Sequence, residues 1–185
     1  MPAYDKLLVL DLDETLVHAR RVPLERAPEF SVGPFVVYRR PHVSAFLEDV
    51  LDAFESVGVW TASTLPYALP VLDHLVDRRR LAFVWGRERC TYHYDREHDE
   101  TVWLKPLTKL RRAGFRKERV LYVDDSPEKI VRSYSNLVAV APFIGDPADD
   151  ELPRLATYLH TLGPVANVRP IEKRGWRRRR GQRPS

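Results

Sequence analysis

Hydrophobic and polar residues alternate along this chain in two patterns. Four-residue apolar runs are typical of strands buried on both faces of a parallel sheet, and they occur at 7–10, 57–60, 81–84, 120–123 and 137–140. Between them lie apolar positions with the spacing of an amphipathic helix. The clearest such stripe contains Val43, Phe46, Leu47, Val50, Leu51 and Phe54. Strands alternating with helices predict an α/β fold with a doubly wound, mostly parallel, Rossmann-like sheet.

Shorter patterns predict the remaining elements. Further helices are expected at 66–76, 107–113 and 152–162, and small β-hairpins at 29–38 and 85–103. Residues 18–28 are polar and contain proline, so we expect a loop there.

The chain is organised around the stretch LLVLDLDETLV, which begins at Leu7. A short buried strand ends there in two carboxylates, Asp11 and Asp13. Reactive groups in open α/β sheets gather just beyond the carboxyl ends of the strands. Residues two apart in extended chain face the same side, so one carboxylate could attack while the other moves a proton. The alternative is a solvated acidic turn, and this stretch alone does not decide between the two.

Composition fits a globular protein with one domain. Apolar residues make up 44% of the chain and charged residues 30%. No apolar run approaches the roughly 18 residues of a membrane span, and no signal peptide is recognisable. The single cysteine, Cys90, is interpreted as a packed thiol and favours a reducing compartment. We therefore expect a cytoplasmic protein, or a nuclear one in a eukaryote, with no membrane partner and a monomeric state.

The positive charge of the chain is concentrated at its C-terminal end. Residues 164–185 contain eight basic residues and one acidic residue, so they carry +7 while the rest of the chain carries −3. We predict a domain at 1–163 followed by a basic, disordered tail at 164–185. The tail is either a solvated segment or a binding site for an anionic partner such as nucleic acid.

Polar residues also follow later strands. Thr61 begins a run of small residues after one strand, where an ordinary helix N-cap is the alternative. Asp124 and Asp125 follow another strand, and Lys105 stands in the mostly apolar segment WLKPL. Carboxylates, hydroxyls and a positioned cation at one edge of a sheet suit phosphoryl transfer through an aspartyl-phosphate.

Each of these groups has a role in that chemistry. Asp11 would be the nucleophile, and Asp13 would protonate the departing alkoxide and later activate water. Lys105 would stabilise charge on the transferred group. A phosphate dianion repels the carboxylates, and Mg²⁺ held by oxygen ligands would offset this repulsion.

The segment DLDETLVH, from Asp11 to His18, resembles the first motif of haloacid-dehalogenase-superfamily phosphatases. It is most similar to the branch of RNA polymerase II C-terminal-domain phosphatases and the small phosphatases akin to them. The similarity extends over residues 5–162. It continues through Arg40-Pro41, Trp60–Ser63, Tyr67–Val71, Arg87–Cys90, Leu104-Lys105, Val123–Pro127 and Asp150–Leu152.

The resemblance implies the catalytic and metal-binding residues. Asp11 is implied as the nucleophile and Asp13 as the acid/base. Mg²⁺ is implied to bind Asp11, Asp124 and the backbone carbonyl of Asp13. Many relatives have Asn where this chain has Asp125, so the resemblance places Asp125 near the metal or its waters without fixing its role. Some relatives lost the catalytic acids and only bind partners, and this chain keeps both.

The resemblance also implies phosphate-binding residues and a substrate class. Thr61 and Lys105 would bind phosphate, with Leu12 and Ala62 as further candidates. The implied activity is that of a Mg²⁺-dependent phosphoserine/phosphothreonine protein phosphatase. Two alternatives stay open: a phosphatase acting on nucleic-acid ends or small phosphoesters, and a non-catalytic binding module.

Many members of the superfamily that act on small metabolites cover the site with a large cap domain. The spacing of the predicted site residues in this chain leaves no room for one. Only 49 residues separate Asp11 from Thr61, and 43 separate Thr61 from Lys105. Independent domains start at about 50 residues, and the expected helices and hairpins already use most of both segments. We therefore expect an open cleft that admits a phosphorylated protein or peptide. It would be flanked by the aromatic residues of the second hairpin, Tyr92, Tyr94 and Trp103.

Overall fold

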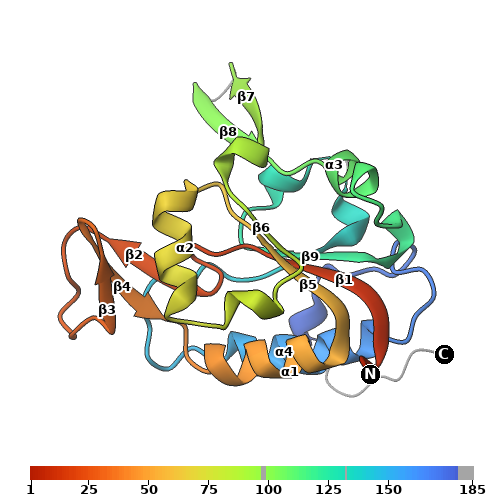
Figure 1. Ribbon diagram of the computed structural model, residues 1–185, viewed down its shortest axis with the longest axis horizontal. Coiled ribbons are helices and arrows are strands. Elements are labelled where there is room, and N and C mark those ends of the chain that lie inside the picture. Colours follow the sequence, from red (N-terminus) through yellow and green to blue (C-terminus); the bar gives the residue numbers. More distant parts are fainter. Residues whose placement is uncertain (97–98, 132, 179–185) are drawn as a thin grey trace.

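A five-stranded parallel sheet forms the centre of the computed structural model, which describes residues 1–96, 99–131 and 133–178 (Figure 1). In spatial order its strands are β10 (Leu137–Ala139), β9 (Val120–Asp124), β1 (Tyr4–Leu10), β5 (Phe54–Trp60) and β6 (Phe83–Trp85). Their order along the chain differs from their order in the sheet, so the connections cross over as in doubly wound folds. The predicted α/β class is confirmed.

Both faces of the sheet are buried, which explains why its strands consist of apolar runs. Leu8 and Leu10 of β1 face one cluster of buried residues, whereas Leu7 and Val9 face the other. The first cluster includes side chains of α1 (Val43–Ala53), α2 (Leu65–Asp73) and α4 (Glu151–Leu162), and the second includes side chains of α3 (Leu107–Arg112). In the view of Figure 1, α1 and α4 lie together below the sheet and α3 lies above it.

Two antiparallel insertions lie outside the central sheet. One has three strands, β2 (Val17–Arg20), β4 (Phe35–Arg39) and β3 (Phe30–Val32), and the other is the hairpin of β7 (Thr91–Asp95) and β8 (Glu100–Leu104). Both hairpins were predicted; the tip of the second includes 97–98, which lie outside the described residues. Six single turns of 3-10 helix complete the described elements: Arg78–Arg80, Arg87–Arg89, Lys117–Arg119, η4 (Pro127–Ile130), Tyr134–Asn136 and Trp176–Arg178.

The expected loop at 18–28 is wrong at its beginning, because strand β2 pairs with β4 there. The register runs from Val17 opposite Arg39 to Arg20 opposite Val36. Val17 is buried and the other three residues of β2 are half-buried. A strand of this kind has no apolar run of its own, and it forms because the edge of the following hairpin supplies its hydrogen-bond partners.

The C-terminal segment differs from the expected disordered tail over residues 164–178. Val168 and Trp176 are buried, the Trp176 indole nitrogen donates to the carbonyl of Ala139 at 2.8 Å, and its ring stacks on Tyr158. A buried tryptophan with a satisfied N–H anchors a chain strongly. Residues 179–185 of the expected tail lie outside the described residues.

Lys173 gives this segment a second anchor. Its side chain is buried, and its ammonium donates to the carbonyl of Ser135 at 2.7 Å, to that of Ile171 at 3.0 Å and to that of Val168. Three carbonyls satisfy all three donors of the ammonium.

Of the helices in the described part of the chain, none is long and apolar enough to cross a membrane.

Candidate active site

Three neighbouring strands bring polar residues to one edge of the central sheet. Asp11 follows β1, Thr61 follows β5 and Asp124 ends β9. The amide of Asp11 donates to the carbonyl of Val123, and that of Thr61 to the carbonyl of Trp85, both at 2.9 Å. Sheet hydrogen bonding therefore continues up to these residues and fixes their positions.

Lys105 forms a buried bridge between two of the carboxylates. Its ammonium lies 2.6 Å from Asp11 Oδ1 and 2.6 Å from Asp124 Oδ2, and its side chain is 1% exposed. The Lys105 amide donates to the carbonyl of Lys129 at 2.7 Å, and the hydroxyl of Tyr122 donates to the carbonyl of Lys105 at 3.3 Å. The expected positioned cation is thus held at both its main chain and its side chain.

Burial and neighbouring charges shift the pKa values of Lys105, Asp11 and Asp124 in different directions. Burial disfavours the charged form of Lys105, but Asp11 and Asp124 outweigh it and raise its pKa. Burial likewise opposes ionisation of Asp11, yet the charge of Lys105 holds the pKa of Asp11 below its ordinary value. Burial and the neighbouring charge of Asp11 raise the pKa of Asp124 to about 7. Asp11 is therefore the ionised member, as a nucleophile must be, whereas Asp124 ionises only near neutral pH, because one lysine does not fully compensate two buried carboxylates.

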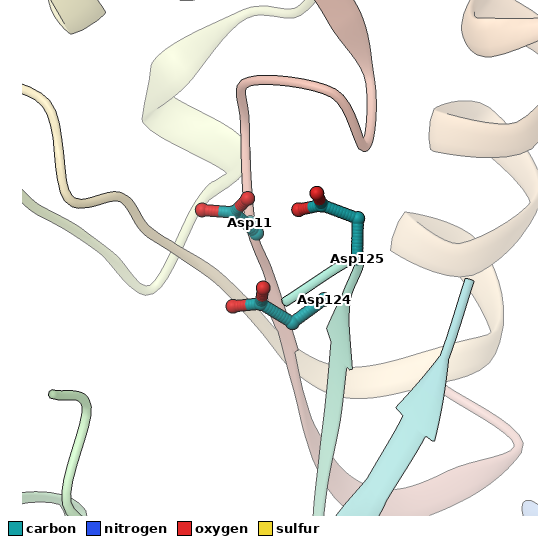
Figure 2. A group of neighbouring side chains, drawn as sticks. All are labelled: Asp11, Asp124 and Asp125. Carbon is teal, nitrogen blue, oxygen red and sulfur yellow. The ribbon is translucent and has the colours of Figure 1, made fainter. Parts of the chain in front are cut away.

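Asp11, Asp124 and Asp125 could together hold a metal ion. One carboxylate oxygen from each lies within 4.8 Å of the others. Figure 2 shows the three carboxylates gathered beyond the ends of the strands, with that of Asp125 pointing toward Asp11. Hard oxygen donors and uncompensated negative charge fit Mg²⁺, which binds through a few carboxylates and keeps several waters. The side chain of Asp13 is outside this group, so its expected contribution through the backbone carbonyl stays a prediction.

The loop after Asp11 turns sharply, and a buried arginine donates a hydrogen bond to its backbone. Glu14 has a positive φ of 56°, and the Thr15 hydroxyl donates to Asp11 Oδ2 at 3.4 Å. Arg40 is 1% exposed; it donates to the Thr15 carbonyl at 3.1 Å and to Asp149 at 2.8 and 2.9 Å. Arg40 therefore connects the loop that follows Asp11 to the segment that precedes α4.

Asp13 lies in a separate hydroxyl network. Its Oδ1 accepts from the Tyr67 hydroxyl at 2.6 Å, and its Oδ2 accepts from Ser63 Oγ at 2.7 Å and from Thr61 Oγ1 at 3.5 Å. Burial raises the pKa of Asp13, and the charge of Asp11 adds to the rise, although the bonds from Tyr67 and Ser63 oppose it. A carboxyl with a raised pKa and flexible hydrogen-bond partners can both give and take a proton.

The expected phosphate-binding residues differ in how they face the site. Thr61 and Ala62 line a cleft of about 420 Å³ together with Asp11 and Asp13. The Thr61 hydroxyl also accepts from the Ser63 amide at 3.0 Å, but the N-cap position of α2 is Thr64, so Thr61 is not the helix N-cap that was its alternative. The side chain of Leu12 is fully buried in the core, which leaves only its main chain to meet a phosphate.

The insertions supply part of the walls of this cleft. Phe35 of β4 and Trp103 of β8 line it, together with Tyr67 and Arg87. Arg87 donates to the Ala62 carbonyl at 2.7 Å, and its guanidinium lies 5.2 Å from the centre of the Trp103 ring. The expected aromatic flank is therefore made by Trp103. Contrary to expectation, Tyr92 and Tyr94 are exposed on the hairpin and do not line the cleft.

Tyr67 and Lys129 are among the residues of the cleft that were not predicted as functional candidates. Tyr67 lies within Tyr67–Val71, one of the segments that carry the family resemblance. Its position on the first turn of α2 could have indicated a contact with Asp13. Lys129 lies on η4, a single turn without hydrophobic periodicity, and no signal in the pattern pointed to it. Cys90, in contrast, is a buried thiol whose pKa is raised by burial, as expected for a packed residue.

Comparison with known proteins gives consistent results. Residues 6–169 match a family model described as NLI interacting factor-like phosphatase. The human carboxy-terminal domain RNA polymerase II polypeptide A small phosphatase 1 is 35% identical over 179 residues, covering 89% of this chain and 62% of the relative. Nuclear envelope morphology protein 1 of Schizosaccharomyces pombe is 30% identical over 175 residues, covering 90% of this chain and 35% of the relative. The chain thus spans between about a third and three fifths of the length of these relatives.

A solved structure shares the fold. The RNA polymerase II CTD phosphatase of fission yeast, bound to beryllium fluoride, superimposes with a TM-score of 0.57 at 18% sequence identity. The match covers 86% of this chain and 50% of that one. This similarity confirms the predicted Rossmann-like α/β core.

Proposed function

Since the chain belongs to the NLI interacting factor-like phosphatase family, we propose that it is a Mg²⁺-dependent phosphomonoesterase that hydrolyses phosphoserine or phosphothreonine in proteins through an aspartyl-phosphate. One observation carries the proposal. Asp11 and Asp13 lie on one loop but in opposite environments, the first beside a buried lysine and the second among hydroxyl groups. Two carboxylates with separated pKa values suit the two roles that the reaction needs.

The reaction proceeds in two steps. In the first, a carboxylate oxygen of Asp11 attacks phosphorus and the bond to the serine or threonine oxygen breaks, while protonated Asp13 gives its proton to that oxygen. In the second, Asp13, now ionised, takes a proton from water as the water attacks the phosphoryl group and releases Asp11. Lys105 keeps Asp11 ionised and adds positive charge beside the transferred group. Mg²⁺, held by Asp11, Asp124 and Asp125, would neutralise charge on the phosphate.

The shape of the cleft supports a protein substrate. It is bounded by Phe35, Tyr67, Arg87 and Trp103, and no cap domain is present in the described part of the chain. An exposed peptide segment can reach Asp11 across such a surface, and the aromatic walls offer contacts outside the phosphate. A small phosphoester would gain little from those walls.

The alternative substrate, a nucleic-acid end, rests on the basic C-terminal segment. Two of its described arginines are already paired within the chain, Arg174 with Glu172 and Arg177 with Glu151. These pairs reduce the charge available to an anionic partner. The cytoplasmic location and the monomeric state expected from the sequence stay predictions.

Substrate turnover tests the proposal. We expect kcat/KM for a phosphoserine peptide to exceed that for free phosphoserine and for a 3′-phosphorylated oligonucleotide, and EDTA to abolish all three activities. Full activity in EDTA or in Asp11→Asn would refute the mechanism. A preference for the oligonucleotide that disappears when the chain ends at Arg178 would instead favour the nucleic-acid alternative.

A further inference from the structure

Lys129 occupies a defined place in the cleft. It lies on η4, directly after the turn that carries Asp124 and Asp125, and it lines the cleft together with Asp13 and Trp103. Its carbonyl accepts the Lys105 amide at 2.7 Å, so its main chain is fixed relative to the reactive carboxylates. Since η4 also packs beside β8, Lys129 shares the cleft with these carboxylates and with Trp103 of β8.

The two lysines of the site are in different states. The ammonium of Lys105 is buried and shared by two carboxylates at 2.6 Å. That of Lys129 is only partly buried, and within the part of the chain that the structure describes it makes no hydrogen bond and has no carboxylate within ion-pair distance. Burial opposes its charge, yet the nearby Asp11 and Asp124 raise the pKa of Lys129 above its ordinary value. Lys129 is therefore a charged group with free donors that faces the space where substrate binds.

The proposed mechanism assigns the reacting phosphate to Lys105 and to a metal ion held by Asp11, Asp124 and Asp125. A second cation with three unused donors is suited to another anionic group. Arg87, the other basic residue among the described residues that line the cleft, is partly engaged with the Ala62 carbonyl and the Trp103 ring. Lys129 is thus the cation of the cleft with the most freedom to bind a group next to the phosphorylated residue.

We propose that Lys129 is a specificity-determining residue that binds a second anionic group of the substrate, so that the enzyme prefers phosphoprotein segments in which an acidic or second phosphorylated residue flanks the target. The inference rests on the proposed protein phosphatase function and extends it to a substrate class. A partly exposed ion pair gives a preference of roughly 1.5-fold to fivefold in kcat/KM. The preference should shrink as salt is added, because exposed charges are screened.

Three phosphoserine peptides of otherwise equal sequence test the inference. The flanking residue is glutamate in the first, a second phosphoserine in the second and glutamine in the third. We expect the wild type to prefer both anionic peptides over the glutamine peptide. Lys129→Met should bring these ratios close to one, and Lys129→Arg should restore them. Lys117→Met, which makes the same change on the surface outside the cleft, should keep the wild-type ratios.

The ratio separates specificity from a general loss of activity. Unchanged ratios in Lys129→Met, or equal slowing of all three peptides, would overturn the inference and leave Lys129 as a counter-charge for the carboxylates. A preference for the second phosphate without one for glutamate would restrict the ligand to phosphate and still support the assignment. Turnover of a chromogenic phosphoester without turnover of any peptide would refute the proposed protein phosphatase function, and the inference with it.

Discussion

Mg²⁺ should stabilise the metal-free protein, and it should do so more at high pH than at low pH. In the metal-free fold, burial and Asp11 raise the pKa of Asp124 to about 7. This pKa exceeds the unfolded value, so the folded protein holds a proton that the unfolded chain has lost between these two values, and stability falls as pH rises through about 7. A cation bound to Asp11, Asp124 and Asp125 would offset both the cost of burying the Asp124 charge and its repulsion from Asp11, which together cause this fall.

The size of the effect follows from binding linkage. At a Mg²⁺ concentration of about 100 times Kd, a ligand that binds only the folded state contributes about 2.7 kcal/mol. For a chain of this length that corresponds to a rise of about 5–11 °C in Tm. About one pH unit below the pKa of Asp124, protonation weakens the apparent affinity about tenfold, and the shift falls to about half.

Thermal unfolding in Mg²⁺ and in EDTA, at pH values about one unit above and below 7, measures both effects. Asp124→Asn should lose the Mg²⁺-dependent shift. Asp150→Asn, which changes a carboxylate that is 72% exposed at the start of α4, should keep it. An equal shift in Asp124→Asn, or a larger shift at the lower pH, would refute the reasoning.

Three further predictions concern the reaction and the fold. Asp11→Asn should be inactive. Asp13→Asn, if its Asp11 still attacks phosphorus, should accumulate a phosphoenzyme because hydrolysis lacks its base, and mass spectrometry would detect it as a mass increase. Rapid turnover by Asp13→Asn would contradict the role of Asp13 as the base. Arg40→Met should lower the free energy of unfolding by about 3 kcal/mol or more in denaturant titrations, since it leaves the Thr15 carbonyl and the Asp149 carboxylate without their partner; a change below about 1 kcal/mol would mean that water replaces Arg40. Ending the chain at Gly163 should lower Tm markedly, whereas ending it at Arg178 should not; equal Tm values would show that residues 164–178 contribute no stability.

The central sheet could be predicted because its strands are buried on both faces. Leu7–Leu10 and the apolar run in β9 need no partner to be recognised, since each reads as an apolar run. The carboxyl ends of parallel strands meet at one edge of the sheet. The sequence therefore predicted that Asp11 and Asp124 lie at the same edge, although it did not give the distance between them. The functional roles of these residues were inferred from carboxylate chemistry and from the family resemblance, and they stay predictions until variants are measured.

Strand β2 and Lys129 could not be predicted, for a common reason. Neither carries a pattern of its own, because each is defined by what lies beside it. The half-buried residues of β2 become a strand only against β4. Lys129 becomes a cleft residue only because a single turn places it between the ends of the sheet and the hairpin. The local sequence pattern predicts well which residues are buried, but it predicts poorly which residues distant in sequence they contact.

The C-terminal segment shows how composition can mislead about a single side chain. A run of arginines predicts solvation because charged groups are costly to bury alone. Lys173 avoids that cost with three carbonyl partners, and Arg177 avoids part of it through Glu151. Trp176 and Val168 add the apolar burial that composition, averaged over the segment, conceals. Net charge therefore describes how a segment interacts with ions at a distance, whereas its order depends on the few residues that find specific partners.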